Sequence, residues 1–131
     1  MTGGLRHYEM SYDRPADLAE VRAFVRASAG HLGLPERRAD LLTLAVSELA
    51  TNTLQHTAGG GRVRLRAEPG RLLCDVIDRG PMRLLGREMP AAQEVRGRGL
   101  AIVESICDEV GIESEDGSTR VCLTFLLEVE P

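Results

Sequence analysis

The residues with the clearest chemical potential are Glu48 and Asn52, which are four positions apart in the chain. In a helix this spacing places both side chains on one face, and His56 lies on nearly the same face. That face also carries an apolar stripe of Leu41, Leu44, Ala45 and Leu49. A carboxylate or an amide that faces a core costs roughly 1–3 kcal/mol unless it has a partner. The two groups therefore need either structural hydrogen bonds from a neighbouring loop or a bound ligand.

Two strand residues further along the chain are predicted to face the same interior. Asp78 shares the alternation of the apolar residues before it, so its carboxylate should project toward the helices. Those apolar residues are Leu72, Cys74 and Val76. Thr119 likewise shares the parity of the apolar residues that follow it. A carboxylate at the edge of a core can accept a hydrogen bond from a buried amino group, whereas a strand Thr is most often simply packed.

Glycine motifs lie close to these positions in the sequence. Gly80 follows shortly after Asp78, and a residue without a Cβ there would let a flat ring approach the backbone. The Gly-Arg-Gly segment at 97–99 precedes a predicted helix that begins at Leu100. Unpaired N–H groups and the positive end of the helix dipole favour phosphate at such a position. Taken alone, each glycine motif is also typical of a tight turn.

Hydrophobic periodicity predicts the elements that must position these residues. Alternation favours strands, and recurrence at three and four positions favours helices. The predicted strands span residues 5–12, 63–67, 71–78, 110–115 and 119–129, and the predicted helices span 16–32, 35–56 and 100–107. A loop over 80–97 without sustained periodicity is predicted to act as a lid. This order fits an α+β, two-layer sandwich with helices on one face of a mixed, mostly antiparallel sheet.

Composition narrows the class of protein. At 131 residues and 43% hydrophobic, the chain is the right size for one compact domain over residues 1–131. The net charge of -4 disfavours direct binding to nucleic acid or to anionic membranes and favours protein partners. The 16 basic residues are all Arg, so a phosphate-binding loop that depends on Lys is excluded.

The cysteines and the hydropathy pattern predict the cellular compartment of the protein. Cys74, Cys107 and Cys122 lack C-x-x-C spacing and sit among apolar neighbours, which is typical of reduced core cysteines. The first twelve residues have no apolar signal-like region, and no stretch is long enough to span a membrane. We therefore expect a cytoplasmic protein without a disulfide framework or a structural zinc site.

In chain order, four segments resemble the successive sequence boxes of the GHKL (Bergerat-fold) ATPases, the superfamily of the histidine kinase-like ATPase domains. The segments are SELATNTLQH at 47–56, DRG at 78–80, GRGL at 97–100 and GST at 117–119. The E-x-x-x-N-x-x-x-H helix and the short length resemble the small anti-sigma factor serine/threonine kinases of bacteria more than histidine kinases, gyrase subunits or chaperones. The resemblance covers most of the chain.

The resemblance implies roles for the residues already singled out. Glu48 would be the general base that takes a proton from a substrate hydroxyl, and Asn52 would hold the Mg²⁺ that bridges the triphosphate of ATP. His56 would lie near the phosphates or support Asn52. Asp78 would accept a hydrogen bond from the adenine amino group, and Thr119 would add a hydroxyl to the same water-linked network.

The resemblance also implies roles for the glycine motifs. Gly80 would clear space for the adenine ring. Gly97 and Gly99 would present backbone N–H groups to the phosphates at the start of the helix from Leu100. Arg98 or Arg96 would meet phosphate charge where other nucleotide-binding proteins use Lys.

The implied function is that of an ATP-dependent protein serine/threonine kinase. It would phosphorylate an anti-anti-sigma (STAS-like) partner and sequester a sigma factor, and a homodimer is compatible with this reading. Met82 stands where relatives usually carry the second glycine of D-x-G-x-G, which favours an alternative, a non-catalytic partner-switching module with a degenerate nucleotide site. A detached histidine-kinase catalytic domain would need a phosphoacceptor His, and the chain before residue 35 offers only His7 and His31.

Overall fold

The computed structural model describes residues 7–56, 59–78, 100–115 and 118–127, and five strands form one sheet within these ranges. The strands are β1 (His7–Tyr12), β2 (Gly61–Glu68), β3 (Arg71–Asp78), β4 (Glu109–Glu115) and β5 (Ser118–Leu126). Their order is β1-β2-β3-β5-β4, and all four pairings between neighbours are antiparallel. The sheet is therefore antiparallel throughout its described part, where a mixed sheet was one expectation.

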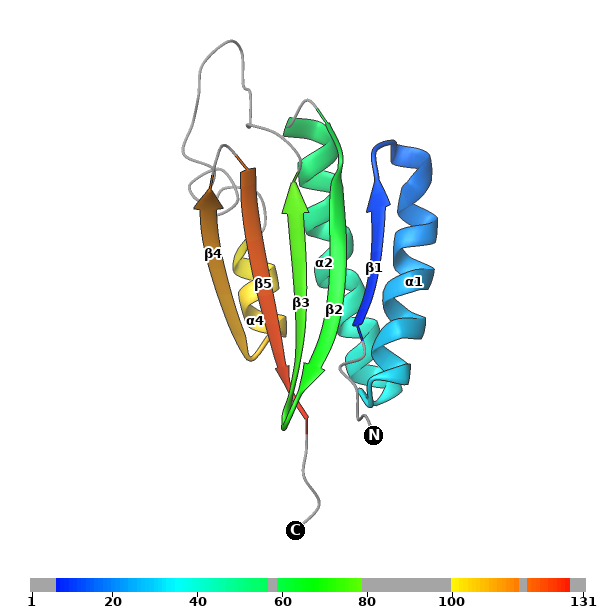
Figure 1. The fold of residues 1–131 in the computed structure, drawn as a ribbon, viewed down its shortest axis with the longest axis vertical. Helices are drawn as coiled ribbons and strands as arrows, with labels where there is room; N and C mark the ends of the chain where they lie inside the picture. Colours follow the sequence, from blue (N-terminus) through cyan, green and yellow to red (C-terminus); the bar gives the residue numbers. More distant parts are fainter. Residues whose placement is uncertain (1–6, 57–58, 79–99, 116–117, 128–131) are drawn as a thin grey trace.

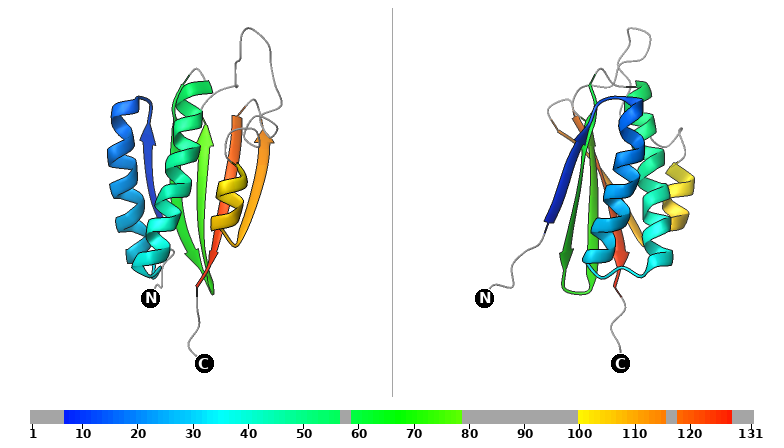
Figure 2. Two further views of the ribbon diagram at one scale, coloured as in Figure 1. Left: turned by 180° about the vertical axis from the view of Figure 1, so that it is seen from behind. Right: turned by 90° about the vertical axis from the view of Figure 1, so that its right-hand side faces the viewer.

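Three helices lie on one face of this sheet (Figure 1). They are α1 (Leu18–His31), α2 (Glu36–His56) and α4 (Leu100–Ile106), and a short 3-10 turn, η1 (Pro15–Asp17), precedes α1. Figure 2 shows α2 between α1 and α4, with all three helices on the same side of the sheet. None of these helices has the length and apolar character needed to cross a bilayer. The predicted two-layer α+β architecture is confirmed.

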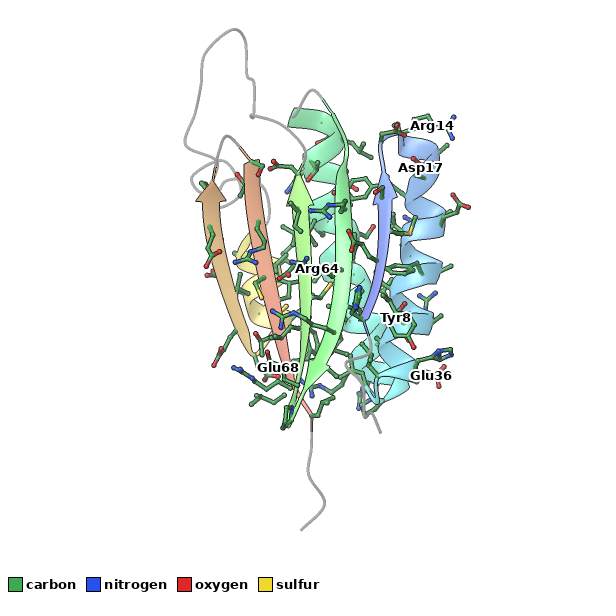
Figure 3. All side chains as sticks on the ribbon, viewed as in Figure 1. Tyr8, Arg14, Asp17, Glu36, Arg64 and Glu68 are labelled. Carbon is green, nitrogen blue, oxygen red and sulfur yellow. The ribbon has the colours of Figure 1, made fainter. Side chains whose placement is uncertain are left out.

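Strand alternation builds the core between the two layers. The inward rows across β2, β3 and β5 are Val63, Val76 and Val121, and then Leu65, Cys74 and Leu123. All six side chains are at most 4% exposed. Residues of the opposite parity lie on the side of the sheet that carries none of the described helices, which we call the open face (Figure 2). Figure 3 looks onto the open face and labels Arg64 near the middle of the sheet.

The element boundaries differ from the sequence expectation by a few residues. The helix predicted over 16–32 begins only after η1, where Asp17 Oδ2 accepts hydrogen bonds from the backbone N–H groups of Asp13 (2.9 Å) and Arg14 (3.1 Å). This bonding holds the connection from β1 in a turn, so the regular helix starts later. The strand predicted over 119–129 is Ser118–Leu126 instead.

One expectation about α2 is wrong. The predicted core stripe includes Leu41 and Leu44, but these side chains are 39% and 47% exposed. The buried residues of α2 are Ala39, Leu42, Thr43, Ala45, Val46, Leu49, Ala50 and Thr53. Apolar residues occupy two adjacent rows of this helix, and periodicity alone does not say which row meets the sheet. Because α2 packs against α1 on one side and α4 on the other, the row from Leu42 through Leu49 turns inward.

Gly60 and Gly70 are among the glycines that the local geometry requires. A Cβ on Gly60 would lie 1.8 Å from the carbonyl oxygen of Tyr12, so β2 can begin beside the end of β1 only because residue 60 has no side chain. Gly70 lies in the predicted hairpin turn after Pro69 and has a φ of 78°, a conformation that glycine adopts without strain. The glycine run at 59–61 therefore also allows the backbone before β2 to pass close to the end of β1.

Arg38 of α2 ties the helical layer to the end of β5. Its Nη2 donates a hydrogen bond to Asp108 Oδ2 at 2.7 Å, and its Nη1 donates to the carbonyl oxygen of Leu126. The guanidinium carbon lies 5.0 Å from the centre of the Phe125 ring. Asp108 Oδ2 also accepts from the backbone N–H of Leu126 at 2.7 Å. These contacts join the start of α2, the end of α4 and the end of β5.

We expect Asp108→Asn to lower the free energy of unfolding at neutral pH. The hydrogen bond from the Leu126 N–H and the adjacent Arg38 hold the pKa of Asp108 below its usual value. Such a carboxylate stabilises the fold above its unfolded pKa of about 4, and the contribution is lost as pH falls through the lower folded pKa. Because the side chain is 35% exposed, the loss should be on the order of 1 kcal/mol or less.

Urea unfolding of Asp108→Asn and the parent at about pH 7 and about pH 3 tests this expectation. The difference between the two proteins should shrink at the lower pH. A difference that stays constant across this range would contradict it.

Candidate functional site

A small cavity lies between α2 and the adjacent ends of β3 and β5. It is lined by Leu49, Asn52, Thr53, Val76, Asp78, Thr119 and Val121. Asn52, Asp78 and Thr119, which were predicted from separate parts of the sequence, therefore meet in one place from three different elements. The cavity places polar groups at one end of an otherwise apolar core.

The register of β3 against β5 explains how Asp78 and Thr119 meet. Ile77 pairs with Arg120, so the next residue of β3 lies beside the preceding residue of β5. The backbone N–H of Thr119 donates to Asp78 Oδ1 at 3.0 Å, and the two residues are only 4% and 6% exposed. A buried carboxylate needs partners, and this bond supplies one of them. Asp78 thus also has a structural role, which the strand parity alone did not reveal.

The size of the cavity limits what the described residues can hold by themselves. Its volume is about 20 Å³. One water molecule needs roughly 10–15 Å³ and two to four polar partners, which Asn52, Asp78 and Thr119 can provide. A purine base is several times larger than a water molecule. These residues alone therefore do not form a complete pocket for a nucleotide.

Glu48 lies one turn before Asn52 on α2, outside the residues that line the cavity. Its side chain is half-buried, and it continues the exposed row that contains Leu41 and Leu44. Asn52 therefore lines the cavity and Glu48 does not, although both side chains are half-buried. A carboxylate in this position is open to a group that approaches from solvent.

Several predicted site residues lie at or beyond the limits of the described chain. His56 ends α2 and Leu100 begins α4, which agrees with the predicted helix limits. The side chains of both residues are outside the described part. Gly80, Met82, Gly97, Arg98 and Gly99 also lie outside it, as does the predicted lid over 80–97. The phosphate-binding half of the site stays a prediction.

Thr53 and three apolar residues complete the cavity, and the sequence analysis assigned none of them to the site. Thr53 Oγ1 donates to the carbonyl oxygen of Leu49 at 3.1 Å, so its hydroxyl is used within the helix. Leu49, Val76 and Val121 provide the apolar walls. A signal for Thr53 was present, since it continues the buried row of α2 at helical spacing.

The cysteines are poorly suited to nucleophilic chemistry. Burial raises the pKa of Cys107 to about 12, and it raises the pKa of Cys74 well above its usual value. Cys122 lies half-buried on the open face, which corrects the expectation that all three belong to the core. Burial and the nearby Asp75 carboxylate raise its pKa to about 12. Thiols with such pKa values are protonated at neutral pH and react slowly.

The described ranges contain no group of three or more His, Cys, Asp and Glu side chains that could hold a metal ion. Among the residues assigned to the site, Asn52 offers an oxygen ligand in the cavity.

Comparison with known proteins agrees with this geometry. A family model described as the histidine kinase-like ATPase domain matches residues 12–125, a range that includes Glu48 and every residue of the cavity. The chain belongs to this family. The GHKL resemblance of the sequence motifs is thereby confirmed, and the antiparallel sheet with helices on one face is the fold that it implied.

Two solved structures share the fold of this histidine kinase-like ATPase domain. The RsbU and RsbW domains of Rv1364c from Mycobacterium tuberculosis match with 23% identity and a TM-score of 0.72, over 93% of this chain and 32% of that chain. The Acinetobacter baumannii histidine kinase AdeS matches with 14% identity and a TM-score of 0.55, over 95% of this chain and 70% of that chain. The chain thus spans about a third of the Rv1364c structure. No curated protein matches the sequence.

The structural role of Asp78 can be separated from any role in binding by two substitutions. Asp78→Ala removes the acceptor for the buried Thr119 N–H and should lower the free energy of unfolding by roughly 1–3 kcal/mol. Asp78→Asn keeps an oxygen that can accept the same bond, so its loss should be clearly smaller. Urea unfolding of both variants provides the measurement. Equal losses would mean that the bond to Thr119 does not support the fold.

Proposed function

We propose that this histidine kinase-like ATPase domain binds ATP and acts as an anti-sigma factor serine/threonine kinase. In this proposal a single domain over residues 1–131 works in the cytoplasm, phosphorylates an anti-anti-sigma (STAS-like) protein and sequesters a sigma factor. The meeting of Asn52, Asp78 and Thr119 in one cavity carries the proposal, because the same residues match the family's motifs. The likeness to a structure that contains an RsbW domain supports this class at the level of the fold.

Asp78 is assigned to recognition of the adenine base. The Thr119 N–H occupies Oδ1, and a carboxylate has acceptor capacity on both oxygens. The exocyclic amino group of adenine is a donor that complements such a group. A water molecule in the cavity would connect the Thr119 hydroxyl to the same network. A ligand that lacks a donor at this position would form one hydrogen bond fewer with Asp78 and would bind less tightly.

Asn52 is assigned to the triphosphate end of the ligand. Its amide oxygen is of the type that Mg²⁺ accepts, and it lies at the cavity beside the base-recognition group. Bound Mg²⁺ supplies positive charge that offsets the charge of the phosphates during transfer. The backbone N–H groups of Gly97 and Gly99, with Arg98 and His56, are assigned to the remaining phosphate contacts.

Glu48 is assigned as the general base. Its half-buried place on the outer side of α2 allows a hydroxyl of a partner protein to approach, which a core position would prevent. Its carboxylate would accept the proton of the acceptor Ser or Thr hydroxyl as that oxygen bonds to the terminal phosphorus of ATP, while the bond from this phosphorus to the bridging oxygen breaks and ADP leaves.

A second candidate function rests on Met82. The chain reads DRGPM at 78–82 where relatives carry D-x-G-x-G, and a long side chain there would take space from a nucleotide. The domain would then hold its partners without transferring a phosphoryl group. Absence of binding in a calorimetric titration with Mg²⁺-ATP would exclude the kinase. Binding without phosphoryl transfer to a partner protein would favour the non-catalytic module, in which the nucleotide is only a structural ligand.

Asp78→Asn should weaken ATP binding strongly while the fold is retained. The amide offers one acceptor in place of a carboxylate and adds a donor that faces the adenine amino group. We expect at least a tenfold rise in the Kd for Mg²⁺-ATP, the effect of losing about 1.4 kcal/mol or more. Asp75→Asn is a matched control, because Asp75 is buried on the same strand but faces the other side of the sheet. Equal ATP affinity in Asp78→Asn and the parent would remove Asp78 from the site.

Glu48→Gln should retain Mg²⁺-ATP binding and lose phosphoryl transfer to the partner protein by ~10²–10⁴-fold, the usual contribution of a positioned base. Glu36→Gln changes the same residue type at the exposed start of the same helix and should transfer at the parent rate. Single-turnover transfer of labelled phosphate measures this effect. An unchanged rate in Glu48→Gln would exclude Glu48 as the base.

A further inference from the structure

The described surface carries few large exposed apolar side chains, and most of them lie on two neighbouring helices. They are Leu41 (39% exposed) and Leu44 (47%) on α2, Ile102 (51%) on α4, and Leu126 (48%) at the end of β5. Exposed apolar residues that stand singly are ordinary, whereas neighbouring ones mark surfaces that bind other molecules. Leu41, Leu44 and Ile102 come from the two neighbouring helices α2 and α4.

The geometry of α2 and α4 places Leu41, Leu44 and Ile102 close together on the side of the two helices that faces away from the sheet. The ion pair of Arg38 with Asp108 at 2.7 Å puts the start of α2 beside the end of α4, so the two helices run antiparallel and pack against each other. With the sheet behind them, their right-handed turn directs Leu41 toward α4 and Ile102 toward α2. Leu44, three positions after Leu41 on α2, faces solvent more directly than Leu41 does. We call these three residues the apolar strip.

The apolar strip lies next to Glu48, the residue assigned as general base. Leu41, Leu44 and Glu48 follow one another at spacings of three and four on α2, so they form one row. At about 1.5 Å per residue, Glu48 lies about 6 Å along the helix axis from Leu44. A hydroxyl within hydrogen-bond reach of Glu48, about 3 Å, must be carried by a polypeptide that passes over this part of α2.

We propose that the apolar strip docks the phosphoacceptor protein, by binding apolar side chains that flank its acceptor Ser or Thr. The inference rests on the proposed kinase function. The strip is directly continuous with Glu48, so a protein that presents its hydroxyl there covers the strip at the same time. Burying these side chains would stabilise the complex and orient the hydroxyl toward the carboxylate.

A second copy of this chain fits the apolar strip less well. A stable interface covers about 800 Å² on each partner, usually with some 20–30 residues, whereas the strip has three large apolar side chains. A small apolar anchor beside a catalytic group instead suits a partner that binds, reacts and leaves.

Steady-state phosphorylation tests the proposal. The acceptors are the purified STAS-domain proteins of the source organism, each assayed with Mg²⁺ and labelled ATP. The variants Leu44→Gln and Ile102→Gln, made singly and together, remove apolar surface with a side chain of similar size and without loss of helix propensity. The KM for the acceptor should rise about tenfold or more in the double variant, as for a lost interface anchor. The kcat and the Kd for Mg²⁺-ATP should stay close to the parent values.

Leu126→Gln is the matched control, since Leu126 has the same exposure but lies at the end of β5. Its KM for the acceptor should equal that of the parent. The proposal is overturned if the strip variants keep the parent KM, or if Leu126→Gln raises it equally. It is also overturned if sedimentation shows that the parent chain alone is a dimer that the strip variants dissociate. A parent chain that binds no Mg²⁺-ATP or labels no acceptor contradicts the kinase function itself, a different result from equal KM values in active proteins.

Discussion

The packing of α2 across the sheet is the constraint on which the rest of the structure depends. Leu42, Val46 and Leu49 are at most 3% exposed, and burial of such side chains contributes roughly 1.5–3 kcal/mol each. Once this row faces the strands, the rotation of the helix is determined, and Asn52 falls at the sheet end where β3 presents Asp78. A shift of one residue would turn the helix by about 100° and take Asn52 out of the cavity. The apolar contacts therefore set the position of the polar ones.

Strands were easier to read from the sequence than helices. One alternating run decides which face a strand buries, so the inward positions of Asp78 and Thr119 were predicted correctly from parity. Helix α2 carries apolar residues on two adjacent rows, and periodicity predicted that Leu41 lies in the core. In the structure the other row is buried, and Leu41 is exposed. The contact between Asp78 and the Thr119 N–H depends on β3 and β5 lying side by side. That pairing spans a long stretch of chain, and no local signal encodes it.

The open face shows how charged residues can cover a sheet without a second helical layer. Asp75 is 1% exposed, and its Oδ2 accepts a hydrogen bond from Arg64 Nη2 at 3.0 Å. Long Arg side chains can bury their stems on a strand surface while their charged ends meet carboxylates. Loss of one partner from such a pair costs more than the pair itself contributes, because a buried charge is left alone. Arg62, Arg64 and Arg120 are each paired with a carboxylate of the same face, namely Glu9, Asp75 and Glu113.

The contact of Asp78 with Thr119 has a consequence for the order of folding. It joins residues 41 positions apart, whereas β2 and β3 are connected by the short turn at Pro69 and Gly70. Hairpins close within microseconds, but distant segments must lose chain entropy before their contacts stabilise them. The cavity is thus completed only when β5 takes its place between β3 and β4. A chain that has folded only as far as the β2–β3 hairpin would carry the Asp78 carboxylate. It would lack the Thr119 N–H that orients this carboxylate. A ligand that binds Asp78 would therefore bind fully folded molecules in preference to partly folded ones.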